Sequence, residues 1–245
     1  MMTHSPTLRL ALAAALALAT TAALADEAAI RKSLTERMPN LPKIDEITKT
    51  PVPGLYEIRI GTDIIYSDEN GNHLIEGSLF DTRTKIDLTK ARIDKFTAVN
   101  FADLPLKDAI VFKQGNGSRK MALFTDPNCG YCKRIEKDLQ NVKDVTIYAF
   151  VIPILGADSM AKAKDAWCAK DTTKAWRAWM IDGQALPRSA ASNCDTSAID
   201  RNLAFARKYR IQSTPALIFE DGSRVPGAIP LQQVEKQLAD AAKKS

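Results

Sequence analysis

Residues 121–132, MALFTDPNCGYC, decide the fold of this 245-residue chain. The stretch begins with the apolar run Met121–Phe124, which is typical of a strand buried on both faces of a sheet. It ends in Cys129-Gly130-Tyr131-Cys132, and residues 132–139 have the apolar spacing of a helix. A strand, a loop and a Cys-x-x-Cys pair at the start of a helix together indicate thiol–disulfide chemistry.

The two cysteines have different expected roles. Placed three positions apart on a first helical turn, they bring their sulfurs within bonding distance, and the backbone N–H groups of that turn favour an anion at Cys129. We therefore expect Cys129 to be the exposed nucleophile that attacks a substrate disulfide and forms a mixed disulfide. Cys132 is expected to be the buried resolving thiol. A purely structural Cys129–Cys132 bridge is the alternative.

The sequence around this motif is of the α/β type. Strands are expected over residues 145–154 and 216–219, and helices over 160–180, 197–209 and 231–238. Asp221-Gly222 predicts a hairpin turn. The three tryptophans of residues 160–180 are interpreted as packing residues rather than as a ligand site.

Residues 26–87 predict a separate, small α+β unit. A helix over 26–38 ends at Pro39, a strand covers 55–60, and a hairpin joins 63–67 to 73–79 through the turn 68–72. A unit of about sixty residues without cysteines is marginal alone, so a partner is expected to complete its core. Residues 88–101 predict a connecting helix, and His73 is interpreted as a surface residue.

The N-terminus predicts export. Arg9 precedes sixteen uncharged residues, 10–25, which end in Ala23-Leu24-Ala25. This pattern is typical of a secretory signal peptide cleaved after Ala25. A membrane anchor is the alternative, but the apolar run is shorter than the roughly twenty residues that a span needs.

Charge and cysteine content exclude other classes of protein. The net charge of +5 is spread along the chain, so no nucleic-acid partner is expected. Four cysteines in an exported protein favour disulfides. Four thiolates could bind zinc, but Cys168 and Cys194 lie far apart, whereas structural zinc sites usually have two close pairs. We expect neither a metal nor a cofactor.

A second motif brings in a family resemblance. Ser213-Thr214-Pro215-Ala216 precedes the strand 216–219 and resembles the cis-proline segment of the thioredoxin fold. Together with residues 124–132, 167–171 and 225–227, it resembles the DsbC/DsbG family of periplasmic disulfide isomerases over the whole mature chain. Gly130-Tyr131 between the cysteines points to the DsbC branch. Pro127, close to the nucleophile, departs from the family pattern.

The resemblance implies an organisation and a set of site residues. It implies a signal peptide over 1–25, a dimerisation domain over 26–87, a linker helix over 88–104 and a catalytic thioredoxin fold with a helical insertion over 105–245. Thr214 and Pro215, joined by a cis bond, would bind substrate together with Gly130 and Tyr131. Cys168 and Cys194 would form a structural disulfide. A second redox pair is the alternative, and it is disfavoured because neither cysteine has a Cys-x-x-Cys partner.

The resemblance also implies a function. The family forms periplasmic homodimers that reshuffle non-native disulfides in misfolded exported proteins and bind unfolded chains as chaperones. A membrane reductase of the DsbD type would keep Cys129 reduced. Thioredoxins proper keep a buried Asp where this chain has Leu123. The alternatives are net oxidation or reduction by the same centre, or a mainly substrate-holding chaperone.

Overall fold

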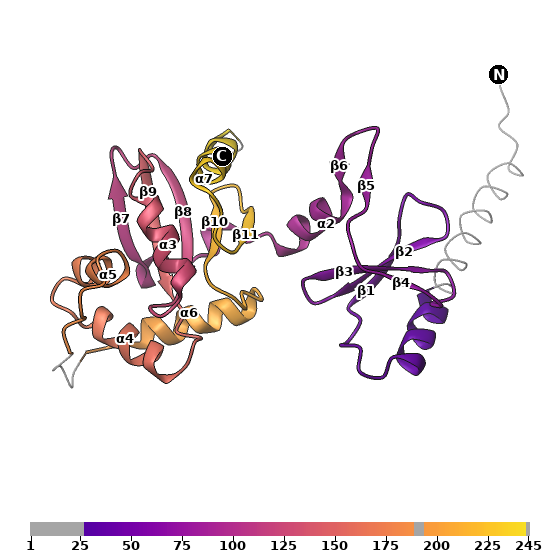
Figure 1. Ribbon diagram of the computed structural model, residues 1–245, viewed down its shortest axis with the longest axis horizontal. Helices are drawn as coiled ribbons and strands as arrows, with labels where there is room; N and C mark the ends of the chain where they lie inside the picture. Colours follow the sequence, from indigo (N-terminus) through magenta and orange to yellow (C-terminus); the bar gives the residue numbers. More distant parts are fainter. Residues whose placement is uncertain (1–26, 189–193, 244–245) are drawn as a thin grey trace, which may run out of the picture. The chain divides into compact units, whose positions relative to one another are not determined.

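The computed structural model describes residues 27–188 and 194–243, and the chain forms two compact units (Figure 1). The first unit extends to Phe96 and the second begins at Thr97. The signal peptide predicted over residues 1–25 and its cleavage after Ala25 lie outside the described residues. Within the described ranges, no helix combines the length and the apolar character that a membrane crossing requires.

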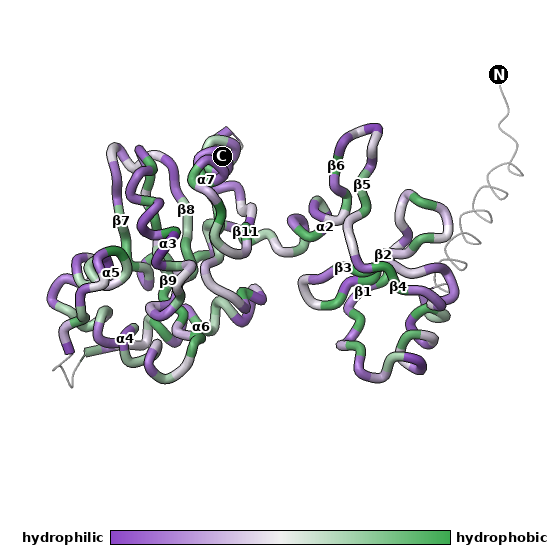
Figure 2. The backbone as a smooth tube through the Cα atoms, in the orientation of Figure 1, coloured by the Kyte–Doolittle hydropathy of each residue, from purple (hydrophilic) through white to green (hydrophobic). Residues whose placement is uncertain are grey.

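The first unit packs one helix on an antiparallel sheet. The helix covers residues 27–37, and the sheet has the order β1-β2-β3-β4, with strands β1 (Glu46–Lys49), β2 (Leu55–Ile60), β3 (Asp63–Asp68) and β4 (Leu74–Ile75). Ile30 and Leu34 of the helix are buried against Tyr56 and Ile58 of β2. Figure 2 shows that the apolar residues of this unit gather where the strands cross. This small core is the one that the alternating pattern of residues 55–67 predicted.

The predicted strand over 73–79 is wrong in its length. Only Leu74 and Ile75 pair with β3, and Gly77 then takes a positive φ of 156°, which turns the chain away from the sheet. The chain continues into a two-stranded ribbon, β5 (Phe80–Asp81) and β6 (Ile86–Asp87), which the sequence analysis did not foresee. Strand β1 was also missed.

Helix α2 (Leu88–Thr97) packs on the sheet of the first unit. Arg92 forms ion pairs with Glu57 of β2 (Nε to Oε1, 2.9 Å) and with Glu46 of β1 (Nη2 to Oε2, 2.8 Å). The Tyr66 hydroxyl hydrogen-bonds to Thr89. The helix ends at Thr97, four residues before the predicted boundary at 101. Two short 3-10 helices follow it, Phe101–Asp103 and Leu106–Asp108.

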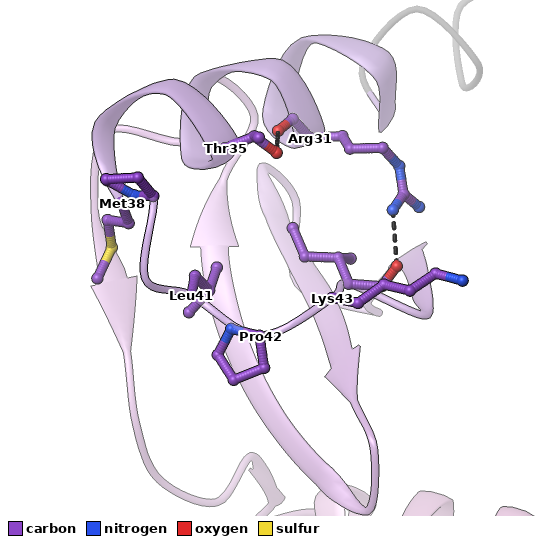
Figure 3. A pocket seen from close by; sticks show the side chains of 8 residues that line it. Arg31, Thr35, Met38, Leu41, Pro42 and Lys43 are labelled. Atoms are coloured by element: carbon purple, nitrogen blue, oxygen red, sulfur yellow. Dashed lines mark hydrogen bonds between the residues drawn. The ribbon is translucent and has the colours of Figure 1, made fainter.

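A surface pocket of about 280 Å³ lies between the first helix and residues 38–44 (Figure 3). Arg31 crosses it and donates from Nη1 to the carbonyl of Ile44 at 2.8 Å. Met38, Leu41 and Pro42 supply the apolar part of its wall. The residues that line the pocket include no cysteine.

The second unit is built on a five-stranded sheet with the order β11-β10-β8-β9-β7. The strands are β7 (Ile110–Gln114), β8 (Arg119–Thr125), β9 (Val145–Val151), β10 (Ala216–Phe219) and β11 (Arg224–Pro226). β8 is central, as predicted: it runs parallel to β9 and antiparallel to β10. Its side chains Met121–Phe124 are fully buried.

Helices cover both faces of this sheet. One face packs against α3 (Gly130–Leu139) and α7 (Leu231–Ala242), which contribute Ile135 and Leu238 to the larger core. On the other face, α6 (Ser197–Lys208) places Phe205 on Phe124 with ring centroids 5.8 Å apart. This is the thioredoxin-like arrangement that the resemblance implied.

The single helix predicted over 160–180 is wrong, because the structure has two helices there. They are α4 (Ala157–Trp167) and α5 (Thr172–Met180). Asp171 starts the second helix, since its carboxyl accepts a hydrogen bond from the backbone N–H of Lys174 at 2.9 Å. The Ala- and Lys-rich composition favours helix throughout residues 160–180. The N-cap at Asp171 nevertheless starts a new helix, so the chain breaks between α4 and α5.

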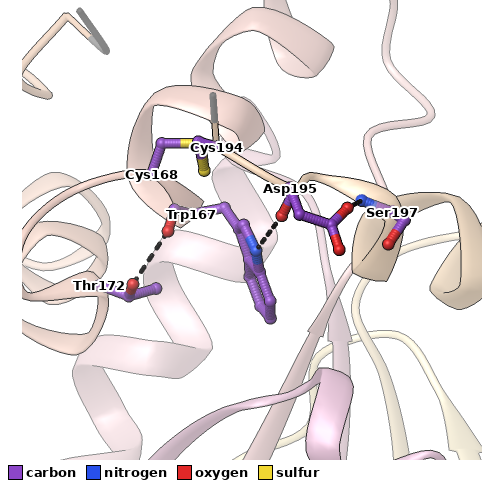
Figure 4. Close-up of a disulfide and its surroundings, with 6 residues drawn as sticks. All are labelled: Trp167, Cys168, Thr172, Cys194, Asp195 and Ser197. Carbon is purple, nitrogen blue, oxygen red and sulfur yellow. Dashed lines mark hydrogen bonds between the residues drawn. A yellow bond between two sulfur atoms is a disulfide. The ribbon is translucent and has the colours of Figure 1, made fainter. Parts of the chain in front are cut away.

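A disulfide joins Cys168 to Cys194 (Figure 4), the pair for which the resemblance implied one. Cys168 ends α4, and Cys194 shortly precedes α6, so the enclosed loop contains α5. Next to the bridge, the indole of Trp167 donates to the carbonyl of Asp195 at 3.1 Å. The bridge thus joins the C-terminal end of α4 to the segment that leads into α6.

Removing this bridge should lower stability substantially. The Cys168→Ala/Cys194→Ala variant is expected to lose about 3.5 kcal/mol of unfolding free energy, because the unfolded chain is no longer cross-linked. Urea unfolding followed by tryptophan fluorescence measures the loss. The control is Cys129→Ala/Cys132→Ala, which keeps the Cys168–Cys194 bridge and is assayed without reductant; it should lose much less. Equal losses in the two variants would contradict the prediction.

Candidate active site

Cys129 lies where the central strand passes into its helix. β8 ends at Thr125, residues 126–128 form a loop, and Cys129 is the N-cap of α3. The Cys129 Sγ accepts a hydrogen bond from the backbone N–H of Cys132 at 3.2 Å. The sulfur therefore occupies the place of a capping oxygen at the positive end of the helix, where negative charge is favoured.

Strand pairing brings the second motif to the same place. Ala216 of β10 lies opposite Phe124 of β8, so the residues just before β10 approach the loop before Cys129. The Thr214–Pro215 bond is cis, as the resemblance implied. The Cys129 thiol donates to the carbonyl of Thr214 at 3.4 Å. The Cys129 sulfur thus contacts a segment that is eighty-five residues away in sequence.

The predicted exposure of Cys129 is wrong. Its side chain is 6% exposed, because the Thr214 carbonyl and the helix terminus cover most of the sulfur, and Cys132 is 0% exposed. Burial, followed by the hydrogen bond with the Cys129 sulfur, raises the pKa of the Cys132 thiol far above its usual value. The side chain that does face solvent here is Tyr131, which is 68% exposed.

The other predicted contact residues differ in accessibility. Gly130 is exposed beside Tyr131, Thr214 is partly exposed, and Pro215 is buried. Pro215 is held by its carbonyl, which accepts a hydrogen bond from the N–H of Gly227 at 2.8 Å. The structure brings all four predicted residues to the nucleophile.

Asp126 is a site residue that the sequence analysis missed. It is fully buried, and its Oδ1 accepts from the Ser159 hydroxyl (2.8 Å) and from the N–H of Asn128 (2.7 Å). Its Oδ2 accepts from the N–H groups of Ile154 (2.8 Å) and Leu155 (3.0 Å). One carboxyl thus joins the loop before Cys129 to the segment that leads into α4.

Pro127, the departure from the family pattern, is anchored from the helical insertion. The indole of Trp179 on α5 donates to the Pro127 carbonyl at 2.7 Å. The ammonium groups of Lys133 and Lys162 lie over the same indole ring, 3.9 and 4.6 Å from its centroid. Burial, followed by repulsion from Lys162, lowers the pKa of Lys133. Trp179 is therefore a packing residue, as interpreted, but one that supports the catalytic loop.

Glu136 is a second buried acid that the sequence analysis missed. It stands on α3 one turn after Cys132 and is 4% exposed. Its Oε1 accepts from the Thr125 hydroxyl and its Oε2 from the Trp176 indole, both at 2.8 Å. Burial raises the pKa of this carboxyl to about 7. In the sequence, the only signal that Glu136 is buried is its position four residues after Cys132 and next to the apolar Ile135.

Glu136 should make stability depend on pH. Its pKa is about 7 in the folded chain against an ordinary 4.5, so between these values the folded state binds more protons than the unfolded state, and stability falls as pH rises. Its contribution is intact below pH 4.5 and lost above pH 7, a change of about 3 kcal/mol. Glu136→Gln should gain that amount over wild type between pH 4.5 and 8 in urea unfolding. A difference independent of pH would contradict the shift.

Comparisons with known proteins match this site and fold. A family model described as a thioredoxin-like domain matches residues 106–242, and one described as the N-terminal domain of disulfide bond isomerase proteins matches residues 21–90. The chain is 40% identical over 210 residues to the probable thiol:disulfide interchange protein DsbC of Bordetella pertussis, which covers 86% of this chain and 73% of that protein.

Two further matches agree. The thiol:disulfide interchange protein DsbC of Escherichia coli K12 is 28% identical over 223 residues, which cover 89% of this chain and 90% of that protein. Among solved structures, a disulfide interchange protein from Neisseria gonorrhoeae superposes with a TM-score of 0.52 at 35% identity, covering 56% of this chain and 98% of that one.

Proposed function

Because the chain belongs to the DsbC family of thiol:disulfide interchange proteins, we propose that it is an isomerase that reshuffles non-native disulfides in exported proteins. The observation that carries this proposal is the arrangement of Cys129. Its sulfur caps a helix and contacts the carbonyl before a cis proline, while a second thiol, Cys132, is buried one turn behind it.

The first step uses the Cys129 thiolate. The Cys129 sulfur accepts a hydrogen bond from the N–H of Cys132 at the start of α3, and its thiol donates to the Thr214 carbonyl. When a substrate disulfide displaces the contact with Thr214, that carbonyl is free to accept from the substrate backbone. The Cys129 sulfur attacks one substrate sulfur, a mixed disulfide forms, and the other substrate sulfur leaves as a thiolate.

The mixed disulfide then has two outcomes. In isomerisation, a thiol of the substrate attacks the substrate sulfur bound to Cys129 and releases Cys129 unchanged in oxidation state. In reductive release, Cys132 attacks Cys129, and the substrate leaves with both sulfurs reduced. Because Cys132 is fully buried, whereas a substrate thiol approaches from solvent, the two thiols compete for the mixed disulfide.

Polypeptide substrates and a chaperone role are supported by apolar surface at the site. Tyr131, Ile154 and Leu155 are 68%, 39% and 56% exposed, and Asp126 holds the last two next to the catalytic loop. Exposed apolar side chains of this kind bind unfolded chains. We propose a periplasmic location and a DsbD-type membrane reductase that returns the Cys129–Cys132 pair to the reduced state, on the strength of the family resemblance.

The first unit supports the proposed homodimer. β4 is an edge strand with only two paired residues, and Ile75 on β4 and Phe80 and Ile86 on the ribbon β5–β6 are about half exposed. Exposed strand edges with apolar side chains pair readily with a second chain. A homodimer through this edge would place two catalytic units on one substrate.

Refolding of a scrambled multi-disulfide protein tests the function and the dimer together. The wild type should recover native disulfides, whereas Ile75→Asp/Phe80→Asp should run as a monomer in light scattering and lose most of the reshuffling. That variant should still reduce a small disulfide, because Cys129 is untouched. Val52→Asp, at an exposed apolar position between β1 and β2, is the control and should behave as wild type. A monomeric wild type or a reshuffling monomer would refute the dimer; failure of the wild type to reshuffle would refute the isomerase.

A further inference from the structure

The indole of Trp179 carries two ammonium groups beside the loop that leads to Cys129. Lys133 of α3 and Lys162 of α4 lie over this ring, 3.9 and 4.6 Å from its centroid. The indole N–H donates to the Pro127 carbonyl at 2.7 Å, so the ring is held two residues before the nucleophile. Each cation is attracted by the ring, but two cations on one ring repel each other. Such a pair calls for negative charge nearby.

One of the two cations has its counter-ion in the chain. The Lys162 ammonium forms an ion pair with Asp158 (Nζ to Oδ2, 2.6 Å) and donates to the side-chain carbonyl of Asn128 at 2.8 Å. Asn128 in turn donates to the same Asp158 carboxylate at 2.7 Å. The hydrogen bonds from Lys162 and Asn128 lower the pKa of Asp158, so this carboxylate stays ionised and balances the charge of Lys162.

Across the two described ranges of the chain, no carboxylate forms an ion pair with Lys133. Asp126, the buried acid of the same loop, accepts from its own four donors, which are the Ser159 hydroxyl and three backbone N–H groups. Burial, followed by repulsion from Lys162, lowers the pKa of Lys133, as expected for a half-buried ammonium without a counter-ion. One positive charge therefore remains uncompensated at the ring.

This charge lies one helical turn from the nucleophile. The backbone N–H of Lys133 donates to the Cys129 carbonyl at 3.1 Å, and Tyr131, between them in sequence, is 68% exposed. One turn of helix rises about 5.4 Å, and an extended chain advances about 3.4 Å per residue. A substrate side chain one or two residues from the cysteine that bonds to Cys129 can therefore span the distance to the Lys133 ammonium.

We propose that Lys133, held on the Trp179 ring, is a specificity-determining residue that binds a carboxylate of the substrate chain. The carboxylate belongs to an aspartate or glutamate one or two residues from the substrate disulfide. It supplies the negative charge that the ring lacks, and it offsets the repulsion between Lys133 and Lys162. Disulfides flanked by acidic residues are therefore attacked faster than the same disulfides flanked by neutral or basic residues.

This inference rests on the proposed thiol exchange at Cys129 and names the substrates that it prefers. Three short peptides test it with the reduced full-length protein. Each peptide is dimerised through its single cysteine, and the residues on both sides of that cysteine are aspartate, asparagine or lysine. Attack by Cys129 releases one peptide as a free thiol, and acid quenching followed by chromatography gives the rate. Each rate is divided by the rate of the same dimer with dithiothreitol, which removes the intrinsic reactivity of the peptide disulfide.

The wild type should prefer the acidic peptide. Its normalised rate with the aspartate dimer should be about fourfold higher than with the asparagine dimer, which is the size of effect that a partly exposed ion pair gives. The lysine dimer should be the slowest of the three. Because the contact is electrostatic and open to solvent, salt at about 1 M should remove most of the preference. Equal normalised rates with the three dimers would overturn the subsite, whereas a wild type that cleaves none of them would refute the proposed thiol exchange itself.

Variants on α3 assign the preference to one residue. Lys133→Gln should abolish the difference between the aspartate and asparagine dimers, and Lys133→Glu should make the lysine dimer the fastest. Arg134→Gln is the matched control, because it removes the same charge from the next position, which is exposed and is not one of the two cations on the Trp179 ring. It should keep the wild-type preference. The proposal is overturned if Lys133→Gln keeps the preference, or if Arg134→Gln loses it to the same extent.

Discussion

Replacing Cys129 with alanine should abolish disulfide reshuffling. Cys132 then remains the only reduced sulfur at the site, and it is fully buried with a raised pKa, so its thiolate is scarce at neutral pH. Each pKa unit above the ambient pH lowers the thiolate fraction about tenfold. We expect the recovery of native disulfides in a scrambled substrate to slow by at least about a hundredfold.

Cys132→Ala is the informative counterpart. The Cys129 sulfur keeps its contact with the Thr214 carbonyl and its place at the end of the helix, so it should still attack substrates. Without the resolving thiol, mixed disulfides should accumulate and be visible as thiol-trapped adducts on non-reducing gels. Full reshuffling by Cys129→Ala, or adducts formed by that variant, would show that the nucleophile has been assigned to the wrong cysteine.

Cys129→Ala also separates catalysis from the chaperone-like binding of unfolded chains. If the exposed Tyr131, Ile154 and Leu155 bind unfolded chains, this variant should still suppress the aggregation of a cysteine-free client. Thiol trapping of the wild type in its native compartment then distinguishes the redox alternatives. A mostly reduced Cys129–Cys132 pair fits isomerisation, and a mostly oxidised pair fits net oxidation.

Replacing Asp126 with alanine should destabilise the second unit and loosen the catalytic loop. The Ser159 hydroxyl and the N–H groups of Asn128 and Leu155 lose their acceptor at once, and the N–H of Ile154 keeps only the carbonyl of Ile152 at 2.9 Å. Each donor left unpaired in a buried place costs about 1–3 kcal/mol, and water reaches some of them, so we expect a loss of about 4 kcal/mol in unfolding free energy. Urea unfolding measures it.

A matched control distinguishes this loss from a change of charge alone. Asp158 lies in the same region and accepts from Asn128 and Lys162, but its side chain is largely exposed. Asp158→Ala should leave the unfolding midpoint nearly unchanged. The rate at which Cys129 reacts with an alkylating agent should change in Asp126→Ala, because the loop before the nucleophile is no longer held to residues 154–155. Equal behaviour of the two variants would rule out the anchoring role of Asp126.

The sequence predicted most of the second unit because its signals are local. The apolar run 121–125, the helical spacing after Cys132 and the turn at Asp221-Gly222 each act over a few residues. The errors occurred where local preference was overridden. A composition that favours helix concealed the break at Asp171, and a single glycine at position 77 ended the strand predicted over 73–79.

The sequence by itself determined the chemistry: two cysteines at the start of a helix, a proline before a neighbouring strand, and a family that exchanges disulfides. Only the tertiary structure decided how that chemistry is controlled. From sequence alone, an acidic residue is expected on the surface. In the structure, Glu136 and Asp126 are buried, and their carboxyls are hydrogen-bonded to Trp176 and Ser159, which come from distant segments. Burial depends on contacts between distant segments, and so do the cover over Cys129 and the pKa values around it.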